Sequence, residues 1–441
     1  MLPTLGRSLL GAALALGLAV PAAQAVPAND ARGFVDTIGV NTHLFYTDTV
    51  YYEYPMLKQR LQELGVRHIR DGLKPGRQDL YDRLNDLSRS GIKSTLINCD
   101  FISADGWDLY IDEAKNKVRN SVEALEGVNE PDLHDGGTHD GGAWWNDARG
   151  CNYWTYQLAK GANKYEYGPP LKVPIYGPSA TGTSFSKLGD LLTGPHADGG
   201  NTHPYPGSEK PSGPGYYPFS RAMNEIRQAN FQGKNVPIVA TETGYHDALD
   251  TTSGHRPVSK KAAGIYMPRL FLEYAKAGVE RTFAYELVDL GNVYPPGGSE
   301  YANHFGLFES DWSYKPSARA LKNTIGFLDS PSAGRRQPLA YTLEGTGDED
   351  GAGPAGVVKD SLFQKADGSW WLALWQDSTV WDTEAKQDIS NPANNVRVNL
   401  PRTMNVVGYR PTQGTGSMGS LRSSVFSANV SDDVLLIKLA D

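Results

Sequence analysis

Cysteine is scarce in this sequence: the 441 residues include only Cys99 and Cys151. Two thiols cannot form a cysteine metal cage by themselves, and no CxxC motif is present. An even pair allows one disulfide in an oxidising compartment, and two buried free thiols are the alternative. Both readings stay open at the level of the sequence.

Clusters of basic residues are also absent. The chain carries 42 Lys and Arg against 50 Asp and Glu, which gives a formal net charge of −8. Recognition of a phosphate backbone needs clustered positive charge, so we expect no nucleic-acid partner. After residue 25 no apolar stretch approaches the ~20 residues that span a bilayer, so we expect no membrane partner.

The first 25 residues have the pattern of an export signal. Arg7 precedes an apolar run from Leu9 to Val20, Pro21 ends this run, and Ala23-Gln24-Ala25 supplies the small residues of a cleavage site. A buried or membrane helix is the alternative, but the run is too short to cross a bilayer. We therefore predict a cleaved signal peptide over residues 1–25 and a secreted or periplasmic protein.

Residues 26–328 alternate between short apolar runs and amphipathic segments. The helical patterns at 56–64, 80–90 and 259–277 each stop at a glycine, which accepts the left-handed conformation that commonly follows a helix. Eight strand–helix repeats predict an α/β fold of the (β/α)8 TIM-barrel type. A doubly wound open sheet is the alternative, but no GxGxxG turn follows any run. The eight predicted strands lie within residues 38–44, 66–70, 92–98, 122–129, 173–176, 200–203, 236–241 and 279–286.

The pattern changes over residues 329–441. Short runs with alternating polar and apolar residues, such as 369–375, 396–400 and 433–439, are separated by turn residues, and no helical periodicity is visible. This pattern predicts a C-terminal β-sandwich domain after the barrel.

Two glutamates stand at the ends of the fourth and seventh predicted strands. Glu130 lies in Asn129-Glu130-Pro131, and Glu242 directly follows the run 236–241. A TIM barrel collects its chemistry at the carboxyl ends of its strands, so both side chains should face one site. Cleavage of a glycosidic bond uses such a pair: one carboxyl group protonates the leaving oxygen, and the other attacks or activates water. A single glutamate at a strand end is ordinarily a cap or an ion-pair partner, but two at these positions favour catalysis.

At these residues the sequence resembles clan A of the glycoside hydrolases, which are retaining β-glycosidases with (β/α)8 barrels. In that clan the glutamate of Asn-Glu-Pro is the acid/base and the glutamate of the seventh strand is the nucleophile. The resemblance therefore implies these catalytic roles for Glu130 and Glu242. Families 39, 30 and 5 are the ones it resembles, and the first two carry a similar sandwich.

The same resemblance implies a set of substrate-binding residues. Asn129 precedes the acid/base, and Arg70 ends the second strand as a clan arginine does near the nucleophile. His203-Pro204-Tyr205 is similar to the clan's His-x-Tyr motif, whose tyrosine hydrogen-bonds the nucleophile.

Further candidates come from their positions near the predicted strand ends. His43 lies on the first predicted strand, where a structural role is the alternative, and Glu286 ends the eighth strand, where many clan members have Trp. A third carboxylate at Glu286 would contact substrate hydroxyls or pair with Arg70. Trp144, Trp145 and Tyr245 follow the catalytic glutamates, and their flat rings suit the apolar CH faces of sugars.

The sequence thus predicts a secreted retaining glycoside hydrolase that cleaves β-glycosidic bonds of a polysaccharide or oligosaccharide. We expect a monomer that needs no cofactor. One alternative is a secreted, non-catalytic carbohydrate-binding protein on a barrel scaffold. Another is a metal-dependent barrel hydrolase that uses His43, His203, His246 and Asp71, although the first strand lacks the HxH pattern of such sites.

Overall fold

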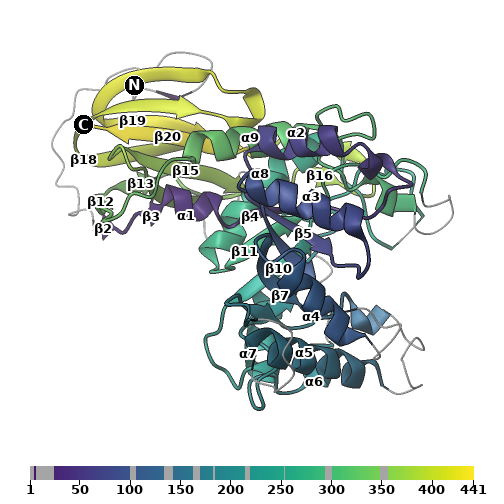
Figure 1. Cartoon of the computed structure of the whole chain (residues 1–441). Coiled ribbons are helices and arrows are strands. Elements are labelled where there is room, and N and C mark those ends of the chain that lie inside the picture. The colour runs from purple at the N-terminus through teal and green to yellow at the C-terminus, as the bar shows by residue number, and fades with distance from the viewer. Residues whose placement is uncertain are drawn as a thin grey trace.

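The structure is a computed structural model of the whole chain, drawn in Figure 1. It describes residues 4–5, 24–99, 106–133, 143–161, 169–181, 184–213, 219–252, 254–293, 300–347 and 356–441. The predicted signal peptide, 1–25, lies outside the described residues except for residues 4–5 and 24–25.

Eight short parallel strands form the first body. They are β4 (Ile38–Asn41), β5 (His68–Gly72), β6 (Lys93–Ile97), β7 (Val122–Glu126), β8 (Ile175–Tyr176), β9 (Gly200–Thr202), β10 (Ile238–Thr243) and β11 (Arg281–Ala284). Their order in the sheet is β8-β7-β6-β5-β4-β11-β10-β9. A parallel bridge between Tyr176 and Gly199 brings the two edge strands together and closes the ring. The predicted (β/α)8 barrel is confirmed, and each predicted run overlaps one of these strands.

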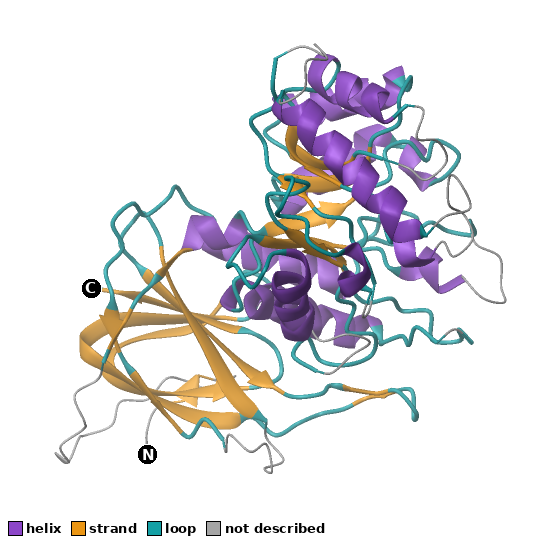
Figure 2. Ribbon diagram, turned by 90° about the horizontal axis from the view of Figure 1, so that it is seen from below, coloured by secondary structure: helices purple, strands orange, loops and turns teal. Residues whose placement is uncertain are grey.

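Helices surround the barrel strands (Figures 1 and 2). Helix α2 shows why they form: Leu57, Leu61 and Leu64 recur on one face and are buried, and Gly65 ends the helix at a φ of 78°. The α-helices are α1 (Ala31–Val35), α2 (Tyr54–Leu64), α3 (Gln78–Arg89), α4 (Trp107–Asn116), α5 (Trp144–Lys160), α6 (Phe185–Leu188), α7 (Phe219–Asn230), α8 (Lys260–Lys276) and α9 (Pro316–Leu328). Short 3-10 helices are η1 (Val50–Tyr52), η2 (Pro131–Leu133), η3 (Glu300–His304) and η4 (Pro411–Gln413). None of the helices in the described ranges is long and apolar enough to cross a membrane.

The second body is the predicted C-terminal β-sandwich, which the structure confirms as a fold. Its long central strand, β18, changes partners along its length: residues 397–399 pair with β13, and residues 405–409 pair with β20. The strands are β12 (Leu339–Ala340), β13 (Thr342–Glu344), β14 (Val357–Gln364), β15 (Trp370–Asp377), β16 (Trp381–Asp382), β17 (Gln387–Asp388), β18 (Asn394–Tyr409), β19 (Ser417–Val430) and β20 (Leu435–Ala440). Three N-terminal strands also pair with them: β1 (Thr4–Leu5) with β19, β2 (Ala25–Val26) with β12 and β3 (Asn29–Asp30) with β14.

A disulfide joins the barrel to one of its helices. Cys99 follows β6 and is bonded to Cys151 in α5, with the two Cα atoms 6.4 Å apart. Both residues are buried beside Val128, two positions before Glu130. Of the two readings that the sequence left open, the structure therefore contains the disulfide.

Candidate active site

The two predicted catalytic glutamates meet at the carboxyl end of the barrel. Glu130 lies four residues beyond the end of β7, and Glu242 lies near the end of β10. One oxygen of each carboxyl group and one ring nitrogen of His203 all lie within 4.8 Å of one another. The two side chains are 20% and 10% exposed, so both are largely withdrawn from solvent but reachable.

The surroundings of Glu242 favour its ionised form. Arg70 donates to Oε1 of Glu242, and the Tyr205 hydroxyl donates to Oε2 at 2.8 Å. Burial by itself would raise the pKa of Glu242, but the positive charges of His203 and Arg70 and the bond from Tyr205 outweigh it and lower the pKa. Glu242 is therefore a carboxylate at neutral pH.

Arg70 is a buried cation shared among several acceptors. Its Nε donates to Oε1 of Glu126 at 2.6 Å, and its Nη2 donates to Oδ1 of Asn129 at 2.7 Å. Nη1, which contacts Glu242, also lies 3.3 Å from Oδ1 of Asn41. The planar guanidinium offers five N–H donors in fixed directions, so it can hold these groups in one arrangement.

Glu130 differs from Glu242 in backbone and in partners. Its φ of 41° lies in the left-handed region, which costs a side-chain-bearing residue roughly 1–3 kcal/mol and is typical of functional positions. Its N–H donates to the carbonyl oxygen of Ser179 at 3.1 Å, which holds this turn in place. Oε1 faces Nδ1 of His203 at 2.7 Å, and no arginine or lysine pairs with this carboxyl group among the described residues.

Glu286 forms a third, fully buried acidic position. The Tyr51 hydroxyl donates to its Oε2 at 2.8 Å, and Nε2 of His43 lies 3.3 Å from the same oxygen. Burial raises the pKa of Glu286 well above its ordinary value, and burial lowers the pKa of His43 to about 4. His43 is therefore uncharged at neutral pH, and the surroundings of Glu286 favour its protonated form. The expected pairing of Glu286 with Arg70 is not found: the guanidinium contacts Glu126, Glu242, Asn41 and Asn129 instead.

No family model and no curated protein sequence matches this chain. Solved structures do. A family 39 glycoside hydrolase from Bacteroides cellulosilyticus WH2 is 16% identical, with a TM-score of 0.61 over 93% of this chain and 81% of that one. A monomeric β-xylosidase from Caulobacter crescentus CB15 is 16% identical, with a TM-score of 0.55 over 95% of this chain and 98% of that one. The family 39 enzyme from Xanthomonas axonopodis pv. citri is also 16% identical, with a TM-score of 0.54 over 95% and 96%. The chain has the family 39 fold.

Within this family 39 fold, several of the predicted substrate-binding residues converge on the two glutamates. Arg70 and Tyr205 contact Glu242, His203 contacts Glu130, and Asn129 contacts Arg70. His43 and Glu286 form the buried cluster with Tyr51 described above.

Of the three predicted aromatic contacts, Tyr245 and Trp144 are buried in the core. Tyr245 is 4% exposed, stacks on Tyr266 at 5.2 Å, and donates its hydroxyl to the carbonyl oxygen of Glu209. Trp144 is buried in a core cluster, and the ammonium group of Lys187 lies over its ring and over that of Trp145. Apolar burial, rather than sugar contact, accounts for Tyr245 and Trp144.

The site also contains residues that the sequence analysis missed. All lie on or next to barrel strands or on the first 3-10 helix, and all are buried: Asn41, Tyr51, Glu126, Asn201 and Thr241. The available signal was a polar residue inside an apolar run, as at Glu126 within 122–129. Its partner, Arg70, could be identified only from the three-dimensional structure.

The groups proposed for a metal-dependent hydrolase do not assemble. Asp71 accepts hydrogen bonds from the Thr42 hydroxyl and from the N–H groups of Leu44 and Gly72, at 2.6 to 2.9 Å. His246 directs Nε2 at the carbonyl oxygen of His255. Among the described residues, the clusters with ligand spacing include neither Asp71 nor His246 nor His43.

Two described clusters do have ligand spacing, and internal partners explain both. In the first, Glu130, His203 and Glu242 are already engaged with one another and with Arg70 and Tyr205. In the second, which consists of Asp247, Asp289 and His304, the ammonium group of Lys315 lies 2.8 Å from both aspartates. Lysine thus occupies the position of a cation there.

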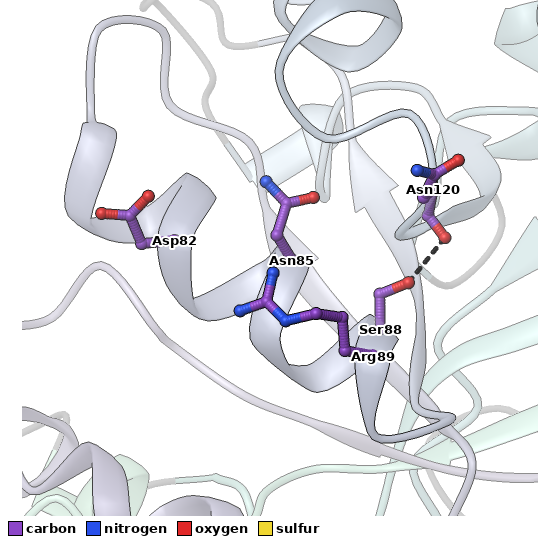
Figure 3. A pocket seen from close by; sticks show the side chains of 5 residues that line it. All are labelled: Asp82, Asn85, Ser88, Arg89 and Asn120. Atoms are coloured by element: carbon purple, nitrogen blue, oxygen red, sulfur yellow. Dashed lines mark hydrogen bonds between the residues drawn. The ribbon is translucent and has the colours of Figure 1, made fainter.

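Figure 3 shows a separate polar hollow beside helix α3. Its volume is about 500 Å³, and it is lined by Asp82, Asn85, Ser88, Arg89 and Asn120. Ser88 and Asn120 come shortly before β6 and β7 begin, at the face where barrel conservation serves stability rather than chemistry. It holds one carboxylate and no pair.

Proposed function

We propose that this protein is a retaining glycoside hydrolase, with Glu242 as nucleophile and Glu130 as acid/base. The observation that carries the proposal is the close pair of carboxyl groups in opposite environments. Arg70, His203 and Tyr205 favour the ionised form of Glu242, whereas the Glu130 carboxyl group is paired, among the described residues, with a histidine that can exchange a proton with it. The family 39 fold supports the same chemistry.

The proposed reaction consists of two successive displacements at the anomeric carbon. In the first, a carboxylate oxygen of Glu242 bonds to the anomeric carbon, the bond to the leaving oxygen breaks, and Glu130 gives that oxygen a proton. In the second, water bonds to the anomeric carbon, the ester to Glu242 breaks, and the water proton returns to Glu130.

The spacing of the carboxyl groups favours retention over inversion. An inverting enzyme leaves roughly 6.5–9.5 Å between its carboxyl groups to admit a water molecule. Here the nearest ligand atoms of Glu130 and Glu242 lie within 4.8 Å, which supports direct attack on the sugar.

We propose that the substrate is a β-linked oligosaccharide or polysaccharide and that the protein is exported to the periplasm or secreted. The pattern of residues 1–25 supports export. One structure with this fold is described as a β-xylosidase, so an aryl β-xyloside is the first substrate to test, followed by other aryl β-glycosides.

The test compares Glu242→Ala with Glu130→Ala on one aryl glycoside whose leaving group needs no proton. Glu242→Ala should lose at least about 10⁴-fold in kcat, because no other group can form the intermediate. Glu130→Ala should form the intermediate and then stall, and added azide should restart it and release a β-glycosyl azide.

The proposal is wrong if Glu130→Ala stays silent with azide or if Glu242→Ala keeps near-normal activity. Binding of glycans by the intact protein without cleavage would instead identify a carbohydrate-binding protein on this scaffold.

A further inference from the structure

A chain of hydrogen bonds crosses the barrel interior behind the two carboxylates, and Asn201 is its first link. Nδ2 of Asn201 donates to Oε2 of Glu126 at 3.0 Å, and Oδ1 accepts the backbone N–H of Thr241 at 3.4 Å. A backbone N–H can only donate, and the carboxylate of Glu126 is bound to Arg70 and accepts. The amide of Asn201 therefore has only one possible orientation.

Thr241 is the second link. Its hydroxyl oxygen lies 2.8 Å from Oδ1 of Asn201 and 3.0 Å from Nε2 of His203. Because Oδ1 carries no proton, the hydroxyl must donate to it, which uses its one proton. The hydroxyl oxygen can then only accept from His203, so Nε2 of His203 carries a proton.

We propose that the chain Glu126–Asn201–Thr241 locks the tautomer of His203, so that Nδ1 is the atom through which His203 shares a proton with Glu130. Nδ1 lies 2.7 Å from Oε1 of Glu130 and 3.6 Å from Oε2 of Glu242. The proposal rests on the proposed function, because it assigns Glu130 the role of acid and base. Glu126, Asn201 and Thr241 are positioning residues, since they act through His203 and Arg70.

The lock affects the pH at which the Glu130–His203 pair gives up its proton. Without that proton, the locked ring would point the Nδ1 lone pair at two carboxylates, Glu130 from the segment after β7 and Glu242 from β10. This repulsion makes the pair hold its proton to higher pH. Arg70 from β5 opposes the effect, and Tyr205, on the same segment as His203, is uncharged at neutral pH.

The pKa of His203 agrees with this geometry. Burial alone would lower it, but the charge of Glu242 and the hydrogen bond to Glu130 outweigh burial and raise the pKa above its ordinary value. Formation of the glycosyl ester removes the Glu242 charge. After the pair has given one proton to the leaving oxygen, it is thus ready to accept one from water.

Thr241→Val tests the lock, with Thr241→Ser as the matched control. Valine has nearly the same shape but no hydroxyl, so the ring can adopt the Nδ1–H tautomer and donate to ionised Glu130. This stabilises the deprotonated pair. The basic limb of the kcat/KM profile should therefore move down by about 0.5 to 1 pH unit in Thr241→Val. It should stay in place in Thr241→Ser.

A second measurement does not depend on activity. In the full chain labelled with ¹⁵N-histidine, the His203 ring is assigned by comparison with His203→Gln. Above the basic limb, wild type and Thr241→Ser should show Nε2–H, and Thr241→Val should show Nδ1–H.

Wild type with the Nδ1–H tautomer overturns the lock even if the enzyme is active. A basic limb that moves equally in both variants, or in neither, also overturns it. A protein that shows the Nε2–H tautomer but cleaves no glycoside refutes the proposed function and leaves the lock supported.

Discussion

Among single residues, Arg70 has the most contacts with the acidic groups of the site, because its guanidinium binds two carboxylates at once. Its guanidinium is 3% exposed and contacts the carboxylates of both Glu126 and Glu242. Arg70 divides its charge between these two carboxylates, and His203 supplies a second positive charge that favours the ionised form of Glu242. The proposed role of Glu242 as nucleophile requires this ionised form.

Glu286 offers a prediction at the same scale. Its pKa is raised on folding, so the folded state binds the proton more tightly than the unfolded state, and the stability that this gives is present at low pH and lost as pH rises. Glu286→Gln mimics the neutral acid and still accepts from Tyr51. We expect it to match wild type near pH 4 and to have a higher free energy of unfolding at pH 8.

Urea unfolding at the two pH values measures this difference. Glu384→Gln is the control, because the side chain of Glu384 is 83% exposed and should show no such pH dependence. Equal destabilisation of Glu286→Gln at both pH values would contradict a raised pKa of Glu286 in the folded state.

Among the secondary-structure elements, those decided by one local pattern were predictable from the sequence. The apolar runs 38–44 and 236–241 correspond to β4 and β10, and a glycine stop marks the end of α2. The two proposed catalytic glutamates, Glu130 and Glu242, were found because each directly follows an apolar run.

Elements and contacts that depend on distant partners were not predictable. Tyr51 and Glu286 are 235 residues apart in sequence, and β3 joins β14 of the C-terminal body. The sequence does not show which side chains of β7 point into the barrel, because this depends on how the strands pair. The pairing of Glu126 with Arg70 could therefore not be predicted. Tyr245 was misplaced for a related reason: an aromatic beside a catalytic strand can equally pack into the core.

The end of α2 allows a prediction about one element. Gly65 has a φ of 78°, and a Cβ there would lie 3.1 Å from Cγ2 of Ile325 in α9. Gly65→Ala should therefore lose about 1 kcal/mol from the left-handed backbone and a further contribution from the close contact. Gly91 has a φ of 85° and nothing within 4 Å of its Cβ position, so Gly91→Ala isolates the backbone cost. Urea unfolding should rank Gly65→Ala below Gly91→Ala, and equal losses would show that α9 adjusts freely.

In the whole molecule, helix α8 connects the barrel to the C-terminal sheet. Nε1 of Trp375 donates to Glu273 at 2.8 Å, and Arg269, fully buried, donates to the carbonyl oxygen of Ser378 at 3.0 Å. Phe327 at the end of α9 packs on Tyr409 with ring centres 4.7 Å apart. The aromatic groups packed between the two bodies indicate that they unfold together, because separation would expose the rings of Trp375, Phe327 and Tyr409 to water.

Asp377, at the end of β15, tests this coupling through pH. The Ser212 hydroxyl donates to it at 2.6 Å, and the ammonium groups of Lys210 and Lys359 lie 3.2 and 2.9 Å from its Oδ2. Burial alone would raise the pKa of Asp377, but the hydrogen bonds from Ser212 and Lys359 and the lysine charges lower it to about 2, against 3.8 for a free aspartate. A lowered pKa gives stability that is present above pH 4 and lost as pH falls towards 2.

Asp377→Asn should thus lower the free energy of unfolding by about 2 kcal/mol at pH 7, with the difference shrinking towards zero near pH 2. Unfolding followed separately by hydrogen exchange of the C-terminal strands and by helical circular dichroism should shift by the same amount. A shift seen only in the hydrogen exchange would show that the sheet unfolds independently of the barrel.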